Sequence, residues 1–527
     1  MVLIAAVLFA ASHPNPVFAR GLPLLAWIAF LPVFWAVRRM SLASSIILGA
    51  LYGYLAYGLF NYYLSLFHPL AGLTVGLGYL AYMALLFPLL RLAAIIFPRR
   101  GYILQFLIWM AYEYLGTLGF LGFPYGISGY TQWNLLPVIQ IADITGVWGV
   151  SALVVFPSAL LAAALYEADI NAKLTSVKAF FRREWAPALA WLTLLTASLA
   201  YGFFSPIDYS GERSAKVALI QHNTDPWMPY NAPTAAQSRE GYRRDLNVLR
   251  RLSDEALAAH PDTELVVWPE TAFVPRIHWH LTVRDNQAAW ELVRELLAYL
   301  GEQEVPFLIG NDDGRRDLSN PNRQLNYNAA LLFEEGQIAG LYRKVHLVPF
   351  TEHFPYQRQF PRFYRFLENS DTHFWDKGTE FTVFESRGLK FASPICFEDT
   401  FGYISRNFVR NGAELLVNLS NDAWANSLSA QMQHMSMAVF RSVENRRSTV
   451  RSTTSGQTAA IDPNGRILAM AEPFSETWLV SQVPIVSPIT VYTRGGDYLG
   501  KAFSALAFLM LIFGAIPYIM RYRFSSS

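Results

Sequence analysis

The distribution of apolar residues along the chain constrains its fold more than any other feature. Residues 1–204 and 502–521 are mostly apolar, whereas residues 206–500 have the composition of an ordinary globular domain. A helix needs about 20 predominantly apolar residues to cross the hydrocarbon core of a bilayer, because each residue adds roughly 1.5 Å along the helix axis. The sequence therefore predicts a membrane protein that carries one large polar domain.

Eight apolar segments are candidate membrane spans, and the first of them is short and interrupted by two prolines. They are residues 2–18, 21–37, 43–66, 72–97, 102–121, 138–166, 186–204 and 502–521. The first segment can also be interpreted as a signal peptide that is cleaved after Ala19. It lacks the basic residue that usually precedes the apolar core of such a peptide, which argues against cleavage.

Basic residues predict how these spans are oriented. Lys and Arg are enriched in cytoplasmic loops, and here they follow alternate spans, at Arg38, Arg39, Arg99, Arg100, Lys173, Lys178, Arg182, Arg183, Arg521 and Arg523. We therefore expect both termini to be cytoplasmic. We expect residues 1–205 to form an N-terminal bundle of about seven transmembrane helices. Residues 206–500 would form an extracytoplasmic domain, and residues 501–527 a final transmembrane helix with a cytoplasmic tail.

Two features of the apolar region suggest that it handles lipid. Glu113 lies inside a predicted span, where an ionisable side chain usually faces the protein interior or a wet cavity. The segment 120–134 that follows is rich in aromatic residues and glycine. It can be interpreted equally well as an interfacial aromatic belt or as a loop that lines a substrate path.

The polar region alternates β-rich runs with helical ones. Helices are expected within 234–260, near 285–301 and at 429–446, and the strands are expected at 216–223, 264–270, 305–312, 328–344, 389–399 and 413–422. Continuous apolar runs in these strands are typical of sheets that are covered on both faces. The alternation predicts a layered α/β domain. The formal net charge of only +2 gives no indication of a nucleic-acid partner.

Three chemically useful residues each end an expected strand: Glu270, Lys344 and Cys396, the last being the only cysteine. The carboxyl ends of strands converge in sheets of this kind. Glu270 could take the proton of the thiol, and Lys344 could stabilise the oxyanion that forms when sulfur attacks a carbonyl. A lone cysteine is more often a small buried apolar residue, so the residues alone leave a structural role open. No His, Asp and Glu set has metal-ligand spacing, and we expect no metal or other cofactor.

Four motifs carry a family resemblance: WPETAFVP at 268–275, YRKVHLVPFTEHFP at 342–355, PICFED at 394–399 and NLSNDAW at 418–424. They closely resemble the nitrilase, or carbon–nitrogen hydrolase, superfamily, whose Glu-Lys-Cys triad matches the three residues named above. With the apolar segments, the whole chain resembles the apolipoprotein N-acyltransferase family. This resemblance implies an α-helical membrane bundle of eight helices that carries an extracytoplasmic, nitrilase-like α-β-β-α sandwich.

The resemblance also implies a reaction and its partners. A fatty acyl chain would pass from a membrane phospholipid to the cysteine as a thioester. It would then pass to the α-amino group of the diacylglyceryl-modified N-terminal cysteine of an apolipoprotein. The resemblance implies that Glu352 supports the active site, that Glu398 is the acidic residue just beyond the nucleophile, and that Trp227 contacts substrate. It further implies a monomer in the bacterial cytoplasmic (inner) membrane.

Two departures from the family pattern bear on substrate preference and rate more than on the reaction class. Phe397 follows the cysteine where the family often has tyrosine, and Ala425-Asn426 replaces a Phe-Gly pair. Two rival functions also remain. The first is a membrane-tethered amidase in which water accepts the acyl group. The second is a lipid or lipoprotein binder that keeps the fold without catalysis.

Overall fold

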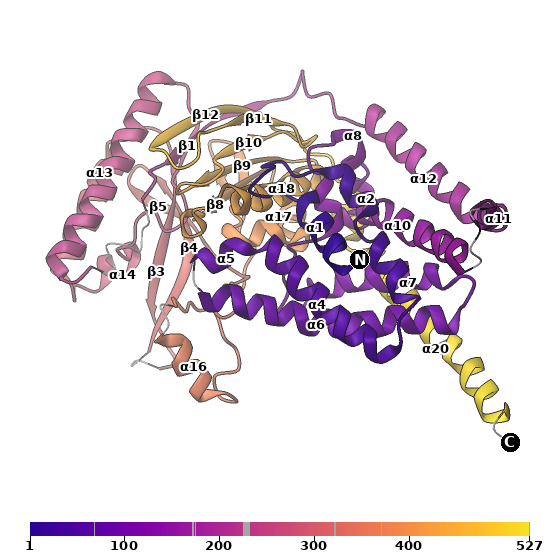
Figure 1. The fold of residues 1–527 in the computed structure, drawn as a ribbon. Helices are drawn as coiled ribbons and strands as arrows, with labels where there is room; N and C mark the ends of the chain where they lie inside the picture. The colour runs from indigo at the N-terminus through magenta and orange to yellow at the C-terminus, as the bar shows by residue number, and fades with distance from the viewer. Residues whose placement is uncertain are drawn as a thin grey trace. The chain divides into compact units, whose positions relative to one another are not determined.

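The computed structural model describes residues 1–67, 69–170, 173, 175–224, 232–320, 323–369 and 372–525. The chain divides into two compact units (Figure 1). The helical unit contains Met1–Pro206, Ala425–Phe440 and Thr490–Ser527, and the sheet unit contains Ile207–Trp424 and Arg441–Ile489. Residues 425–440 and 490–500, which we expected in the polar domain, therefore group with the helices.

The helical unit has sixteen helical elements within the described ranges, besides the first part of α18. They are α1 (Val2–Ser12), η1 (Pro23–Leu25), α2 (Ala26–Ala29), α3 (Leu31–Val37), α4 (Leu42–Phe60), α5 (Tyr62–Phe67), α6 (Pro69–Ile96), α7 (Gly101–Leu115), η2 (Ser128–Gln132), α8 (Leu136–Ile139), α9 (Ala142–Thr145), α10 (Val147–Ile170), α11 (Thr175–Arg183), α12 (Trp185–Phe204), α19 (Val491–Gly495) and α20 (Tyr498–Ser525).

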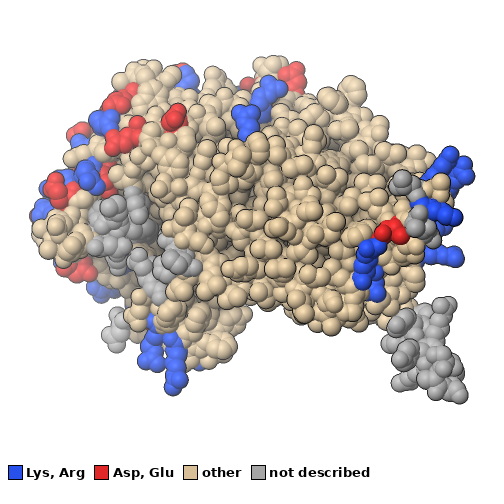
Figure 2. Space-filling view, viewed as in Figure 1, with Lys and Arg blue, Asp and Glu red and all other residues tan. Residues whose placement is uncertain are grey.

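Five helices among the described residues are long and apolar enough to cross a membrane. They lie at Leu42–Phe60, Leu70–Ile96, Val147–Ile170, Trp185–Phe204 and Tyr498–Ile516. Figure 2 shows almost no charged side chain over α4 and α6, whereas Lys and Arg gather at the end of this unit where α11 lies. An uncharged surface of this kind is what the interior of a bilayer requires.

The other three predicted spans contain shorter helices. The first forms only the 11-residue α1, the second is broken into η1, α2 and α3, and the fifth forms the 15-residue α7. The predicted span 138–166 is also interrupted, because Gly146 takes a φ of 63° between α9 and α10. The count of eight complete spans therefore stays a prediction.

The glycine-rich segment after α7 is held inside the helical unit. Glu113 is buried and accepts hydrogen bonds from Trp109 Nε1 (3.1 Å), from Ser128 N (3.2 Å) and from the hydroxyl of Ser128. Residues 126–133 are buried. Residues 126–133 therefore do not face lipid headgroups. Leu121, at the start of the segment, is 52% exposed, so the interpretation of residues 120–134 as an interfacial belt stays open.

The sheet unit contains two six-stranded sheets with the strand orders β12-β1-β2-β3-β4-β5 and β11-β10-β9-β8-β7-β6. The strands are β1 (Ser214–Gln221), β2 (Leu265–Val267), β3 (Phe307–Arg316), β4 (Gln324–Glu334), β5 (Gln337–Arg343), β6 (Phe384–Ser386), β7 (Leu389–Ala392), β8 (Leu415–Ser420), β9 (Ser448–Thr453), β10 (Ala459–Ile461), β11 (Ile467–Met470) and β12 (Thr477–Pro484). The central strands β1, β2 and β3 are parallel, and so are β7, β8 and β9.

Helices cover the outer faces of the two sheets. The helices of this unit are α13 (Ala235–Ala259), α14 (Ile277–Thr282), α15 (Gln287–Gly301), α16 (Pro361–Glu368), η3 (Cys396–Thr400), α17 (Gly402–Arg410), η4 (Ala423–Ala425) and the end of α18 (Leu428–Asn445). Apolar side chains of α13 and α15, such as Leu249 and Leu296, form one core with Ile220 of β1. The hydroxyl of Ser452 in β9 donates to Ile220 O (2.9 Å) and Val267 O (3.1 Å), so the two sheets face each other. This arrangement confirms the predicted α/β layering.

The parallel strands explain where the chemistry-bearing residues lie. β2 ends at Val267, earlier than the predicted 270. The backbone N–H of Trp268 still donates to Leu308 O of β3 (2.9 Å), but Pro269 has no N–H with which to continue the ladder. α17 connects β7 to β8, and α18 connects β8 to β9. The turns at the carboxyl ends of β2 and β7 carry Glu270 and Cys396.

Candidate active site

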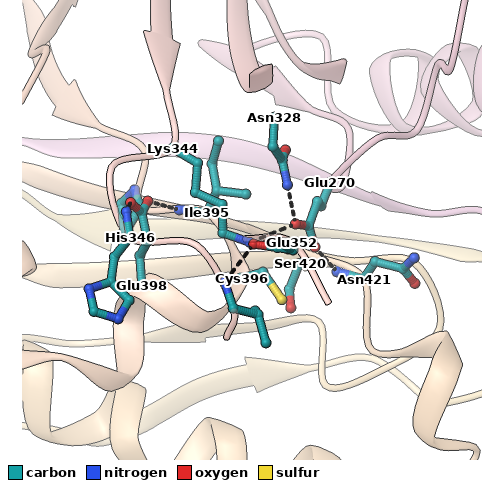
Figure 3. A network of polar contacts seen from close by, with 12 residues as sticks. Glu270, Asn328, Lys344, His346, Glu352, Ile395, Cys396, Glu398, Ser420 and Asn421 are labelled. Carbon is teal, nitrogen blue, oxygen red and sulfur yellow. Dashed lines mark hydrogen bonds and ion pairs between the residues drawn. The ribbon is translucent and has the colours of Figure 1, made fainter. Parts of the chain in front are cut away.

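Glu270 lies in the turn after β2, and three donors hold its carboxylate (Figure 3). One oxygen accepts hydrogen bonds from Asn328 Nδ2 (2.7 Å) and Lys344 Nζ (3.2 Å), and the other accepts one from the backbone N–H of Asn421 (2.8 Å). The next residue, Thr271, has a φ of 49°. Positive φ is rare for a β-branched residue, so the surrounding contacts impose this turn and fix the direction of the carboxylate.

Lys344 follows β5 directly, and its ammonium lies between two carboxylates. Its Nζ donates to Glu270 (3.2 Å) and to Glu352 Oε1 (2.8 Å), while Glu352 Oε2 accepts the N–H of Val348 (2.9 Å). Burial alone lowers the pKa of Lys344, but the charges of Glu270 and Glu352 more than offset it, so the pKa is raised. Burial raises the pKa of Glu352, against the opposing charge of Lys344. Lys344 is thus a permanent cation in a fixed place.

Cys396 begins η3 in the turn after β7, and its backbone takes a φ of 50°. The side-chain amide of Asn418 donates to the carbonyls of Pro394 (3.1 Å) and Cys396 (3.4 Å), which holds the turn. Figure 3 shows the sulfur beside the carboxylate of Glu270 and the ammonium of Lys344. Burial first, and then the charge of Glu270, raise the pKa of the thiol, and Lys344 opposes that rise. The resting thiol is therefore neutral and needs a base.

Glu398 connects the lysine segment to the cysteine turn. Its buried carboxylate accepts hydrogen bonds from Tyr342 Oη (2.8 Å), Val345 N (2.7 Å), His346 N (2.9 Å) and Ile395 N (2.8 Å). Burial raises the pKa of Glu398 to about 7, while these donors and the charge of Lys344 act in the opposite direction. Three of these donors belong to the segment around Lys344, and the fourth, Ile395 N, precedes Cys396. Glu398 therefore fixes the lysine segment relative to the cysteine turn.

The remaining predicted residues lie around this cluster or outside the described part of the chain. Phe397 is buried, and its ring packs against Phe401 at 5.0 Å and His346 at 5.8 Å between ring centroids. Trp227 lies outside the described residues. Asn426, which replaces the glycine of the family pattern, has a φ of 37°. Asparagine tolerates this left-handed conformation better than most residues.

Three asparagines that hold the site were not predicted: Asn328, Asn418 and Asn421. Asn418 and Asn421 belong to the motif NLSNDAW, so that motif carried a signal for them. Asn328 lies within β4 with no sequence signal that separates it from an ordinary strand residue. Within the described ranges, no group of three His, Cys, Asp or Glu side chains could hold a metal ion.

Comparisons with known proteins agree with this geometry. The family model "Carbon-nitrogen hydrolase" matches residues 216–488, and the model "Apolipoprotein N-acyltransferase N-terminal domain" matches residues 5–160. Apolipoprotein N-acyltransferase 1 of Treponema denticola is 46% identical over 532 residues, which cover 97% of this chain and 95% of that protein. The protein of the same name from Treponema pallidum is 48% identical over 536 residues, which cover 99% and 96%.

Among solved structures, Nit3 of Saccharomyces cerevisiae, a member of the nitrilase superfamily, aligns with a TM-score of 0.38 and 19% identity. It covers 52% of this chain and 90% of its own. The assignment does not depend on this weak similarity, because the two family models and the full-length relatives carry it. This chain therefore belongs to the apolipoprotein N-acyltransferase family, as a membrane protein with a carbon–nitrogen hydrolase domain.

Proposed function

We propose that this protein moves a fatty acyl chain from a membrane phospholipid, through a thioester on Cys396, to the α-amino group of a diacylglyceryl-modified apolipoprotein. Relatives named for apolipoprotein N-acylation match nearly the whole chain, which supports the reaction class. The observation that carries the proposal is the buried cluster of Glu270, Lys344 and Glu352 beside the single cysteine. It supplies a base, a cation and a nucleophile within one site.

The first half-reaction loads the enzyme. Glu270 takes the proton of the Cys396 thiol as sulfur attacks the ester carbonyl of the phospholipid. The negative charge that develops on the carbonyl oxygen is stabilised by the ammonium of Lys344. When the tetrahedral intermediate collapses, the glycerol oxygen leaves and takes the proton from Glu270. The products are the acyl thioester and a lysophospholipid.

The second half-reaction passes the chain to the lipoprotein. The neutral α-amine attacks the thioester carbonyl and gives a proton to Glu270, while Lys344 again stabilises the oxyanion. Collapse breaks the carbon–sulfur bond, and the proton on Glu270 returns to the sulfur. An amide and the free thiol result, so Glu270 acts as base and then acid in both halves. We assign supporting roles to four further residues. Glu352 holds Lys344 in place, and Glu398 and Phe397 shape the pocket. Trp227 contacts substrate.

The membrane unit gives the reaction its physical setting. Both substrates are anchored by acyl chains, and moving such a chain into water costs about 0.8 kcal/mol per CH₂. A catalyst anchored in the same membrane avoids that cost. We propose that the protein is a monomer of the bacterial inner membrane with residues 206–500 on the periplasmic side. The alternation of basic residues supports cytoplasmic termini.

The proposal is tested by mass spectrometry of the purified protein after incubation with phospholipid and no acceptor. The wild type should gain the mass of one acyl chain, and neutral hydroxylamine should remove it, as expected for a thioester. Cys396→Ala should gain nothing. Glu270→Gln should also stay uncharged, because an amide cannot take the thiol proton. Equal labelling of wild type and Cys396→Ala would contradict the proposal.

The same sample separates acyl transfer from amide hydrolysis. An acyltransferase should keep its thioester in water for many times longer than it needs to discharge the chain to an added diacylglyceryl lipopeptide. A tethered amidase would lose the chain to water at a comparable rate with or without the amine. A matched lipopeptide with an acetylated N-terminus serves as control, since it has the same lipid and no nucleophile.

A further inference from the structure

Arg451 is a fully buried arginine in β9 that binds two carboxylates at once. It forms an ion pair with Asp399, and its second guanidinium nitrogen lies 3.6 Å from Asp422 Oδ2. None of the three side chains is more than 4% exposed. Buried charges are expensive unless they are paired, so an arrangement of one cation and two anions in the interior requires a reason.

The two acids belong to the two segments that build the active site. Asp399 lies in η3, three residues after Cys396. Asp422 follows Asn421, whose backbone N–H donates to Glu270 Oε2 at 2.8 Å. Ser420 Oγ donates to Asp422 Oδ1 (3.1 Å). One guanidinium therefore joins the turn that carries the nucleophile to the segment that holds the base.

The pairing of β8 with β9 aligns Arg451 with the same turn. Arg451 is the register partner of Asn418 in these parallel strands. The amide of Asn418 donates to the carbonyls of Pro394 and Cys396. Neighbouring residues of two strands thus hold the cysteine turn: the side-chain amide of Asn418 binds carbonyl groups of the turn, and Arg451 binds Asp399.

We propose that Arg451 is a positioning residue for acyl transfer, which fixes the cysteine turn relative to Glu270 and neutralises Asp399 and Asp422 next to the nucleophile. This inference rests on the proposed role of Cys396. The charged groups that act on the thiol are Glu270, Lys344, Asp422 and Glu352. Lys344 pairs with both glutamates, whereas Arg451 pairs with Asp422. The charge of Asp422 already raises the pKa of the thiol, and without Arg451 that charge would be uncompensated and would oppose formation of the thiolate more strongly.

Alkylation of Cys396 by iodoacetamide tests this inference without requiring acyl transfer, because the chain has no other cysteine. Loss of an opposite charge near a group shifts its pKa by about one unit or more. Arg451→Met should therefore be alkylated about tenfold more slowly than wild type at pH 8, with its pH profile displaced upward. The double variant Arg451→Met/Asp422→Asn should recover most of the wild-type rate, since the uncompensated charge is gone.

Arg451→Lys separates charge from geometry. Lysine keeps the positive charge but lacks the fork that reaches two carboxylates. The Arg451→Lys variant should be alkylated with the wild-type pH profile. Its thioester should nevertheless form from phospholipid at least tenfold more slowly, because the cysteine turn and Glu270 are no longer held together. Arg447→Met is the matched control: Arg447 is also buried, but it donates to the carbonyls of Ala413 and Pro488. Its alkylation rate should equal that of wild type.

The outcomes are distinguishable. If Arg451→Met is alkylated like wild type, or if the double variant is as slow as the single one, the electrostatic role is wrong. If Arg451→Lys loads phospholipid at the wild-type rate, the geometric role is wrong. A wild type that is alkylated but never loaded by phospholipid would contradict the proposed function, while the alkylation results would still decide the role of Arg451.

Discussion

Gly310 lies in β3 against the turn that carries Glu270, and it leaves no room for a side chain. A Cβ at this position would lie 2.3 Å from Pro269 O, 2.6 Å from Thr271 N and 2.7 Å from the Cα of Glu270. All three are backbone atoms, so no flexible side chain can rotate away. Carbon atoms pack at roughly 3.5 Å or more. Gly310→Ala must therefore move this turn, or β3, by roughly 1 Å.

A shift of that size should affect catalysis more than stability. The three hydrogen bonds of Glu270 have lengths of 2.7 to 3.2 Å, and they cannot all survive a displacement of their acceptor. Misplacing a catalytic group by 1 Å can reduce a rate about 10²-fold. Overpacking a core position typically costs about 1–3 kcal/mol of folding free energy. We expect thioester formation to slow about 10²-fold in a protein that still folds.

Single-turnover loading with phospholipid, followed by mass spectrometry of the acylated chain, measures the predicted loss. Thermal unfolding of the same samples measures the change in stability. Gly301→Ala is the matched control, because a Cβ at Gly301 in α15 would meet nothing within 4 Å. Loading by Gly310→Ala at a rate within threefold of wild type would refute the argument that this contact sets the position of Glu270.

Four further predictions follow from the site and the topology. Lys344→Met should abolish thioester formation, because Glu270 and Glu352 lose their shared cation; breaking a buried pair should also lower stability by about 3–5 kcal/mol, measured by denaturant unfolding. Phe397→Tyr should leave thioester formation intact and change only the transfer to a lipopeptide amine, so loss of loading would contradict it. The rate of iodoacetamide alkylation of wild-type Cys396 should still be rising at pH 9, since its raised pKa lies above the ordinary value of about 8.5; a plateau below pH 8 would be inconsistent with that. A reporter fused after Ser527 should be active only in a cytoplasmic format, and periplasmic activity would reject the eight-span topology.

The sequence predicted the residues of the site better than their surroundings. Glu270, Lys344 and Cys396 could be predicted as candidates because each follows an expected strand and each lies in one of the four family motifs. Asn328 could not be found, since a polar residue in a strand gives no indication of which carboxylate it meets. Its contact with Glu270 joins β4 to the turn after β2, so it exists only once the sheet has formed.

Apolar composition also predicted the membrane region more reliably than its individual helices. Each of the five long helices overlaps one predicted span, although none shares both of its bounds. Residues 21–37 read as one span, but Pro23 and Pro32 each stand at the start of a separate helical element. Proline is tolerated there and disrupts a helix interior. Hydropathy averages over such breaks, so it locates an apolar segment without showing where the helix starts again.

Strained backbone occurs at the site, where three of the nine described non-glycine residues with positive φ lie. Thr271, Phe350 and Cys396 all have positive φ, and each lies within two residues of Glu270, Glu352 or the nucleophile itself. A non-glycine residue in this conformation costs about 1–3 kcal/mol and persists only where neighbouring contacts impose it. Here those contacts include the Asn418 amide on the cysteine turn and the Asn421 N–H on Glu270. The strained turns follow β2, β5 and β7, and the side chains of Glu270, Lys344 and Cys396 meet there at one point.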